Sequence, residues 1–124
     1  MPRTSTRTKP EPAAVLTKAV TRAAELLDIQ RARIAKALGV SPASATRLFQ
    51  GSYRLDPQRK EWELAVLLLR MFRSLHALVG DEATARAWLR SENLGLGARP
   101  IDLMETAEGL VRVVQYLDAA RGRV

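Results

Sequence analysis

The sequence contains no cysteine among its 124 residues and only one histidine, His76. The absence of cysteine excludes disulfides, thiolate nucleophiles and cysteine-based zinc sites, and it suits a reducing compartment. A single histidine without cysteine offers no metal site, so we expect neither a metal nor a cofactor. We expect His76 to lie half-exposed on a helix.

Long apolar runs are also missing. The longest strictly apolar stretch, residues 64–69, is far shorter than the roughly 20 residues that a membrane-spanning helix needs. The N-terminus is polar and basic with no apolar segment behind it, which argues against a secretory signal peptide. Together with the ordinary apolar content of 47%, these absences predict a soluble, cytoplasmic protein that does not bind membranes.

Catalytic arrangements of side chains are absent as well. No Ser-His-Asp set suggests itself, and the carboxylates occur in pairs such as Glu61 with Glu63 and Glu105 with Glu108. We expect all four on polar helix faces, without a buried environment to raise a pKa. The sequence therefore predicts a protein that is not an enzyme.

Positive charge is concentrated in the first half of the chain. Residues 1–60 hold 12 Lys/Arg against 4 Asp/Glu, a net charge of +8, whereas residues 61–124 hold 8 against 9, a net charge of −1. The formal net charge of +7 thus belongs to the N-terminal half. Basic regions usually bind polyanions, most often nucleic acid. A solvated basic surface is the alternative that composition leaves open.

Apolar periodicity predicts an all-α fold without strands. Residues 1–12 should form a flexible basic arm. Residues 64–69 are apolar on every side, so their helix should be central, covered by other helices or by a second subunit. We expect two lobes, an N-terminal three-helix bundle and a C-terminal bundle around this long helix. The expected helices span residues 13–28, 29–38, 42–50, 57–79, 82–93 and 107–120, with a loop at 94–100 and a helical turn at 101–104.

The stretch IAKALGVSPASATRLFQG, residues 34–51, has the spacing of a helix-turn-helix. Gly39 can end the first helix in the left-handed conformation that glycine adopts at little cost. Ser41 can cap the next helix, and Pro42 fits its first position, where no N–H is needed. Ala35 is small where the two helices cross. The turn is too tight for these helices to run parallel.

The outward face of the second helix suits a DNA major groove. Ser44 and Thr46 can donate to bases or phosphates, Arg47 can contact guanine or a phosphate, and Gln50 can pair with adenine. The alternative is an ordinary helical hairpin with a solvated polar face. The predicted DNA-binding residues are Ser41, Ala43, Ser44, Thr46, Arg47 and Gln50, with phosphate contacts predicted at Arg31, Arg33, Lys36 and Arg54.

Two parts of the chain resemble one family of known proteins. Residues 34–51 resemble the Xre-type repressor helix-turn-helix, a pattern that many regulators share. Residues 80–117 are similar to the toxin-binding domain of the Xre/MbcA/ParS antitoxins. The matching elements are Gly80-Asp81, Ala85 with Trp88-Leu89, Gly97 with Pro100, Leu103, and Thr106 with Glu108-Gly109. The resemblance covers residues 13–120, and both parts occur in the expected order.

The resemblance implies a helix-turn-helix DNA-binding domain over 13–56 and a helical dimerisation and toxin-binding domain over 57–124. It implies a homodimer that binds operator DNA, represses its own operon and neutralises a cognate RES-domain toxin, which consumes NAD. In the family, the antitoxin's C-terminal segment covers the toxin's NAD pocket.

Carried over to this sequence, the toxin-binding residues are Arg121, Gly122, Arg123 and Val124. This tail reads RGRV, whereas relatives often carry a glycine followed by small or apolar residues. The alternative function is that of a stand-alone dimeric helix-turn-helix repressor, whose C-terminal half serves only dimerisation.

Overall fold

The computed structural model describes residues 11–122, and that range contains seven α-helices and no strand. An isolated antiparallel bridge joins Asn93 and Ala98. Among the described residues, no helix combines the length and the apolar character that crossing a bilayer requires. The predicted all-α fold is confirmed. The helices are α1 (Pro12–Leu26), α2 (Arg31–Leu38), α3 (Pro42–Gln50), α4 (Lys60–Val79), α5 (Glu82–Arg90), α6 (Pro100–Leu103) and α7 (Ala107–Ala120).

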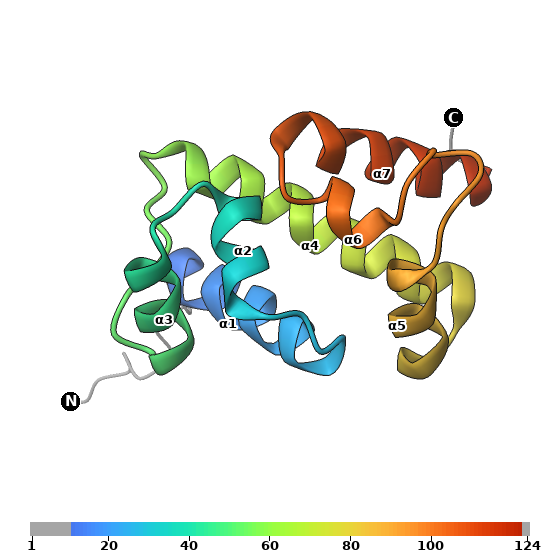
Figure 1. The fold of residues 1–124 in the computed structure, drawn as a ribbon. Coiled ribbons are helices and arrows are strands. Elements are labelled where there is room, and N and C mark those ends of the chain that lie inside the picture. Colours follow the sequence, from blue (N-terminus) through green and yellow to red (C-terminus); the bar gives the residue numbers. More distant parts are fainter. Residues whose placement is uncertain (1–10, 123–124) are drawn as a thin grey trace.

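The longest helix, α4, is the centre of the molecule. It contacts α1, α2, α5 and α7, and Figure 1 shows it running behind α2 and α6 along the length of the molecule. Ala65, Leu68, Met71 and Leu75 on α4 are completely buried. The prediction that this helix is central is confirmed, although Val66 within it stays about half exposed.

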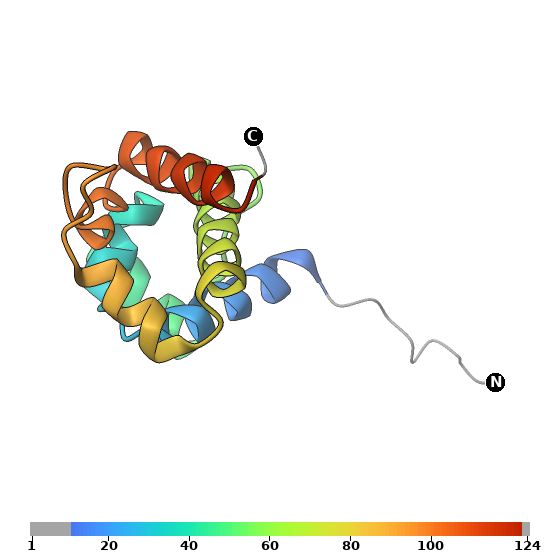
Figure 2. The same cartoon turned by 90° about the vertical axis from the view of Figure 1, so that its right-hand side faces the viewer.

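Both halves of the chain contribute to one hydrophobic core. The buried cluster extends from Leu16 on α1 to Leu117 on α7, and Figure 2 shows α4, α5, α6 and α7 arranged around the interior. The two lobes expected from the sequence therefore do not have separate cores. The physical reason is that α4 is apolar on several sides, so helices from both halves bury their apolar faces against it.

Local sequence signals set the helix boundaries at the α2–α3 turn. Gly39 has a φ of 71°, in the left-handed region, and ends α2. The Ser41 hydroxyl accepts a hydrogen bond from the Ser44 N–H at 3.0 Å and thereby caps α3. Asp81 and Thr106 cap α5 and α7 in the same way. The predicted turn between the two helices is confirmed in its details.

The prediction that Glu61 lies on a polar face is wrong. Its side chain is buried, because the connector between α3 and α4 places donors over it. Tyr53 Oη donates to Glu61 Oε2 at 2.6 Å, and the Asp56 N–H donates to the same oxygen at 2.9 Å. Burial and the neighbouring carboxylate raise the pKa of Tyr53 to about 12. Glu61 thus holds the connector, and with it the end of α3, against the core.

Candidate DNA and protein interfaces

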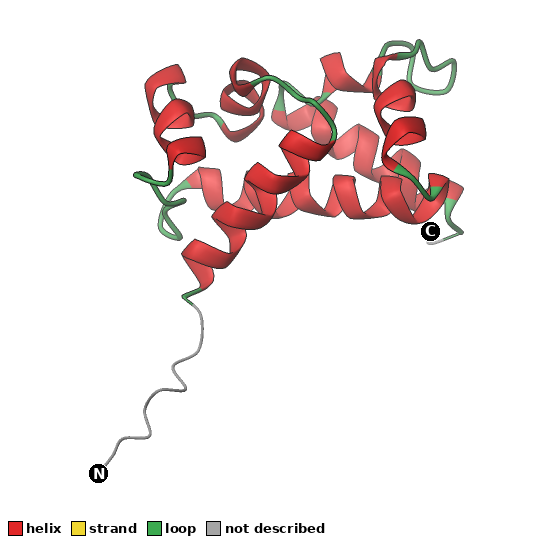
Figure 3. Ribbon diagram, turned by 90° about the horizontal axis from the view of Figure 1, so that it is seen from below, coloured by secondary structure: helices red, strands yellow, loops and turns green. Residues whose placement is uncertain are grey.

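The face of α3 that the sequence predicts to bind DNA points away from the core. Ala45 and Leu48 on the opposite face are buried, and Figure 3 shows α3 at one end of the molecule. The outward residues are accordingly available to a large ligand such as a DNA groove. Ser41, Ala43, Arg47 and Gln50 are exposed, and Ser44 and Thr46 are partly exposed.

The Arg47 guanidinium makes one hydrogen bond among the described residues. Its Nη2 donates to the Ser44 Oγ at 3.3 Å, which directs the guanidinium toward the start of α3. An arginine has five N–H donors, so four remain for another partner. The N-terminal part of a recognition helix is the part that contacts base edges in helix-turn-helix proteins, and Arg47 is oriented toward it.

The cations predicted to contact phosphate have different surroundings. The Arg31 guanidinium lies over the Phe49 ring, 5.1 Å from the ring centroid. Arg54 forms an ion pair with Glu11. Lys36 Nζ lies 3.7 Å from Glu105 Oε1, and its side chain is 66% exposed. These three side chains are exposed at the N-terminal half of the molecule.

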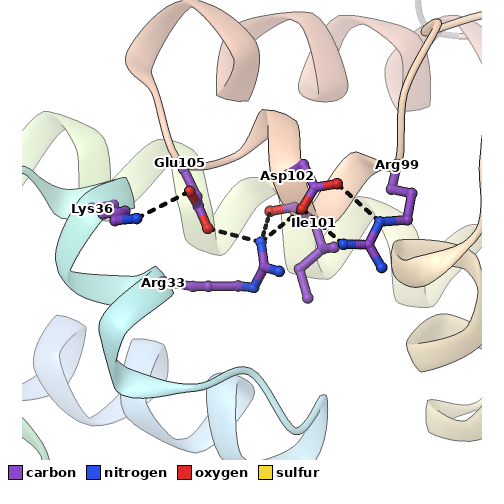
Figure 4. Close-up of polar contacts among 6 residues, drawn as sticks. All are labelled: Arg33, Lys36, Arg99, Ile101, Asp102 and Glu105. Atoms are coloured by element: carbon purple, nitrogen blue, oxygen red, sulfur yellow. Dashed lines mark hydrogen bonds and ion pairs between the residues drawn. The ribbon is translucent and has the colours of Figure 1, made fainter.

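Arg33 is engaged within the molecule. Its Nη1 donates to Asp102 Oδ1 at 2.9 Å, to Glu105 Oε2 at 2.7 Å and to the Ile101 carbonyl at 3.2 Å (Figure 4). Two carboxylates neutralise the positive charge of this guanidinium, so it attracts a phosphate only weakly. We therefore revise its predicted role and propose that Arg33 links α2 to α6.

The same cluster sets the charge state of Asp102. Hydrogen bonds from Arg99, at 2.9 and 3.0 Å, and from Arg33 lower the pKa of Asp102. The pKa of Arg99 is raised in turn. Because the folded-state pKa of Asp102 is depressed, its contribution to stability is present at neutral pH and is lost as the pH falls through that pKa. The link between α2 and α6 is thus intact at physiological pH.

The segment predicted to bind the toxin begins at the end of α7. Arg121 Nη1 donates to the buried Ser74 Oγ at 2.9 Å, which fixes the start of this segment to α4. Gly122 has a φ of 78°, in the left-handed region. Arg123 and Val124 lie outside the described residues. A groove of about 520 Å³ adjoins Arg121. The cations that line it are Arg70, Arg73 and Arg121.

The loop predicted at residues 94–100 is present between α5 and α6, but its fixed packing was not predicted. The Gly97 N–H donates to the Asn93 carbonyl at 2.7 Å, and Arg112 Nη2 on α7 donates to the Leu96 carbonyl at 2.8 Å. Leu96 is buried, whereas Leu94 is completely exposed. The only available signal was the repeated Leu-Gly in LGLG, which predicts a loop but not which leucine packs.

Apolar side chains are also exposed on α1 and α4. Val15, Leu26 and Val66 are each about half exposed. A groove of about 450 Å³ lies between α1 and the first half of α4. We call its apolar lining the α1–α4 surface, formed by Pro12, Val15, Leu16, Ala19, Trp62, Val66 and Leu69.

Comparisons with known proteins match both halves of the chain. A model of the Xre-like helix-turn-helix domain of antitoxins matches residues 6–70. A model of the C-terminal toxin-binding domain of Xre/MbcA/ParS antitoxins matches residues 74–123. Among solved structures, the chain is similar to one in the crystal structure of the M. tuberculosis MbcT-MbcA toxin–antitoxin complex. That match has 29% identity and a TM-score of 0.63, and it covers 89% of this chain and 96% of the other. No curated protein matches the sequence.

Proposed function

Since the chain belongs to the Xre/MbcA/ParS antitoxins, we propose that it neutralises a NAD-consuming RES-domain toxin and represses its own operon. The observation that carries this proposal is the presence of both family domains in one chain, in order and nearly without a gap. The similar structure from M. tuberculosis is of a toxin–antitoxin complex. Neither activity requires catalysis by this chain.

Repression would use α3 as the recognition helix in the operator's major groove. Its outward residues are exposed, and Arg31, Lys36 and Arg54 are exposed beside it. Phosphate contacts of this kind supply affinity without sequence preference and weaken as salt rises. Base contacts would come from α3, above all from Arg47.

We further propose a homodimer formed through the α1–α4 surface. A two-fold dimer can place two recognition helices on half-sites about 34 Å apart, one turn of DNA. The surface supports this, because half-exposed Val15 and Val66 flank one apolar groove. Exposed apolar side chains that gather on one face are candidates for such an interface.

The dimer proposal predicts a particle of twice the 13.7 kDa chain mass by light scattering. Val66→Glu should give the monomer mass at micromolar concentration, since it would bury a carboxylate in an apolar interface. Val111→Glu is the matched control, because Val111 is also exposed but lies on α7, outside the groove. A Val66→Glu protein that still has the dimer mass would show that another surface is used.

Neutralisation would use residues 121–124 to cover the toxin's NAD pocket, with Arg121 held in place by Ser74. Co-expression with the cognate RES-domain toxin should preserve growth and cellular NAD. A variant that lacks residues 121–124 should lose this protection completely and keep its helical content and operator binding. Failure of the full chain to protect would contradict the antitoxin function. Full protection by the truncated chain would contradict only the role of the tail.

A further inference from the structure

Leu94 is the most exposed large apolar side chain in the part of the chain that the structure describes. It is 100% exposed, whereas the next, Leu26, is 54% exposed. Scattered exposed leucines are normal on protein surfaces, so exposure alone implies little. Leu94 is distinguished by the hydrogen-bonded loop that carries it.

The loop that carries Leu94 is fixed at both of its sides. The Asn93 side chain accepts from the Leu96 N–H at 3.0 Å, and its carbonyl accepts from the Gly97 N–H at 2.7 Å. The Leu96 side chain is buried, and its carbonyl accepts from Arg112 on α7 at 2.8 Å. A partner that binds Leu94 would therefore not have to order this segment, and the entropic cost of binding would be small.

Aromatic side chains adjoin the loop. A Cβ on Gly95 would lie 2.7 Å from Tyr116 Cε1, so the Tyr116 ring sits directly against the loop backbone. The Tyr116 ring in turn neighbours Trp88, with 6.2 Å between ring centroids and 31° between planes. Both rings are half-buried. We call Leu94 and Gly95, with the Tyr116 ring against the loop and Trp88 beside that ring, the Leu94 patch.

The position of the Leu94 patch favours a protein partner over DNA. Figures 1 and 3 both place the α5–α6 loop at the opposite end of the molecule from α3. All four residues lie within residues 74–123, the segment that matches a toxin-binding domain. They also lie outside the α1–α4 surface, so a dimer formed there would leave them free.

We propose that the Leu94 patch is a second docking surface for the cognate toxin, in which Leu94 enters an apolar pocket on the toxin. This inference rests on the proposed function, and it adds a contact separate from the terminal tail. A few residues, most often Trp, Tyr and Arg, supply most of the affinity of a protein interface, and the patch holds Trp88 and Tyr116 as well as Leu94. The tail then covers the active site, while the Leu94 patch supplies residence time.

The test measures the affinity of the purified chain for the cognate RES-domain toxin of the proposed function. Leu94→Ala and Leu94→Asp should weaken binding by about 10- to 100-fold, the effect of one buried leucine side chain. Most of the change should be in the dissociation rate. Leu78→Ala is the matched control, because Leu78 is exposed and also lies in residues 74–123. It should change affinity by less than about 2-fold. Operator affinity, measured alongside, should be unchanged in all variants.

Each other outcome overturns a defined part of the proposal. Wild-type affinity in Leu94→Asp would show that the loop does not touch the toxin. An equal loss in Leu78→Ala would show that the effect is not specific to the patch. A change of Leu94→Asp from dimer to monomer would assign the patch to a second copy of this chain. Absence of binding by the wild-type chain would overturn the proposed function itself, and with it the occupant named here.

Discussion

Replacing Gly109 by alanine is expected to lower the free energy of unfolding by about 3 kcal/mol, at the upper end of the range for overpacked cores. A Cβ at Gly109 would lie 2.0 Å from the Leu103 carbonyl oxygen and 2.8 Å from its carbon. These are backbone atoms at the end of α6, so they cannot rotate away. Without a clash, alanine would stabilise a helix by about 1 kcal/mol relative to glycine. A destabilising effect of Gly109→Ala can therefore be assigned to the contact with Leu103.

Thermal unfolding followed by circular dichroism would measure this effect. For a chain of this length, a loss of that size should lower the Tm by about 10 °C. Glu108→Ala is the control, because Glu108 is exposed in the same helical turn, and we expect it to change the Tm by only a few degrees. A Tm for Gly109→Ala at or above that of the wild type would mean that the Leu103 carbonyl does not approach Gly109 this closely.

Replacing Arg47 by alanine is expected to weaken operator binding by about 10- to 100-fold, the range for a lost arginine–base contact. Among the described residues the Arg47 side chain bonds Ser44 alone, so folding should be almost unaffected. Fluorescence anisotropy with DNA from upstream of its own operon, at one fixed salt concentration, would measure the affinity. Unchanged affinity would count against α3 as the recognition helix.

Arg33→Ala is the matched control, since Arg33 lies on the neighbouring helix of the same motif. It should lose the bonds to Asp102 and Glu105 and lower stability by about 1 kcal/mol, because these pairs are partly exposed. Operator affinity should change by less than about 3-fold. The opposite result, weaker DNA binding without a loss of stability, would return Arg33 to the phosphate contacts.

The sequence predicted the helix-turn-helix well because its signals are local. Gly39, Ser41 and Pro42 act within a few residues of where they stand, and the structure places each in the expected role. The partners of Arg33 are different, because Asp102 and Glu105 lie about 70 residues away in the chain. No pattern of spacing near Arg33 could indicate that pairing.

Burial of single side chains was predicted less well for the same reason. Glu61 belongs to a polar stretch of the sequence. It is buried because Tyr53, in the connector before α4, covers its carboxylate and donates a hydrogen bond to it. Leu94 and Leu96 are each followed by a glycine, so the residue that follows does not tell them apart. They differ because Arg112 on α7 holds the backbone at one of them. Tertiary contacts decide which of these side chains is buried, and those contacts cannot be identified from a single sequence.

The core shared around α4 has a consequence for how the protein is lost from a cell. Because helices of both halves pack on one element, unfolding should be a single cooperative event. A protease that cleaves the unfolded chain would then destroy the proposed DNA-binding and toxin-binding surfaces at once. Under the proposed function, loss of the protein would release active toxin and derepress the operon at the same moment. NAD consumption and new synthesis of the antitoxin would then begin together.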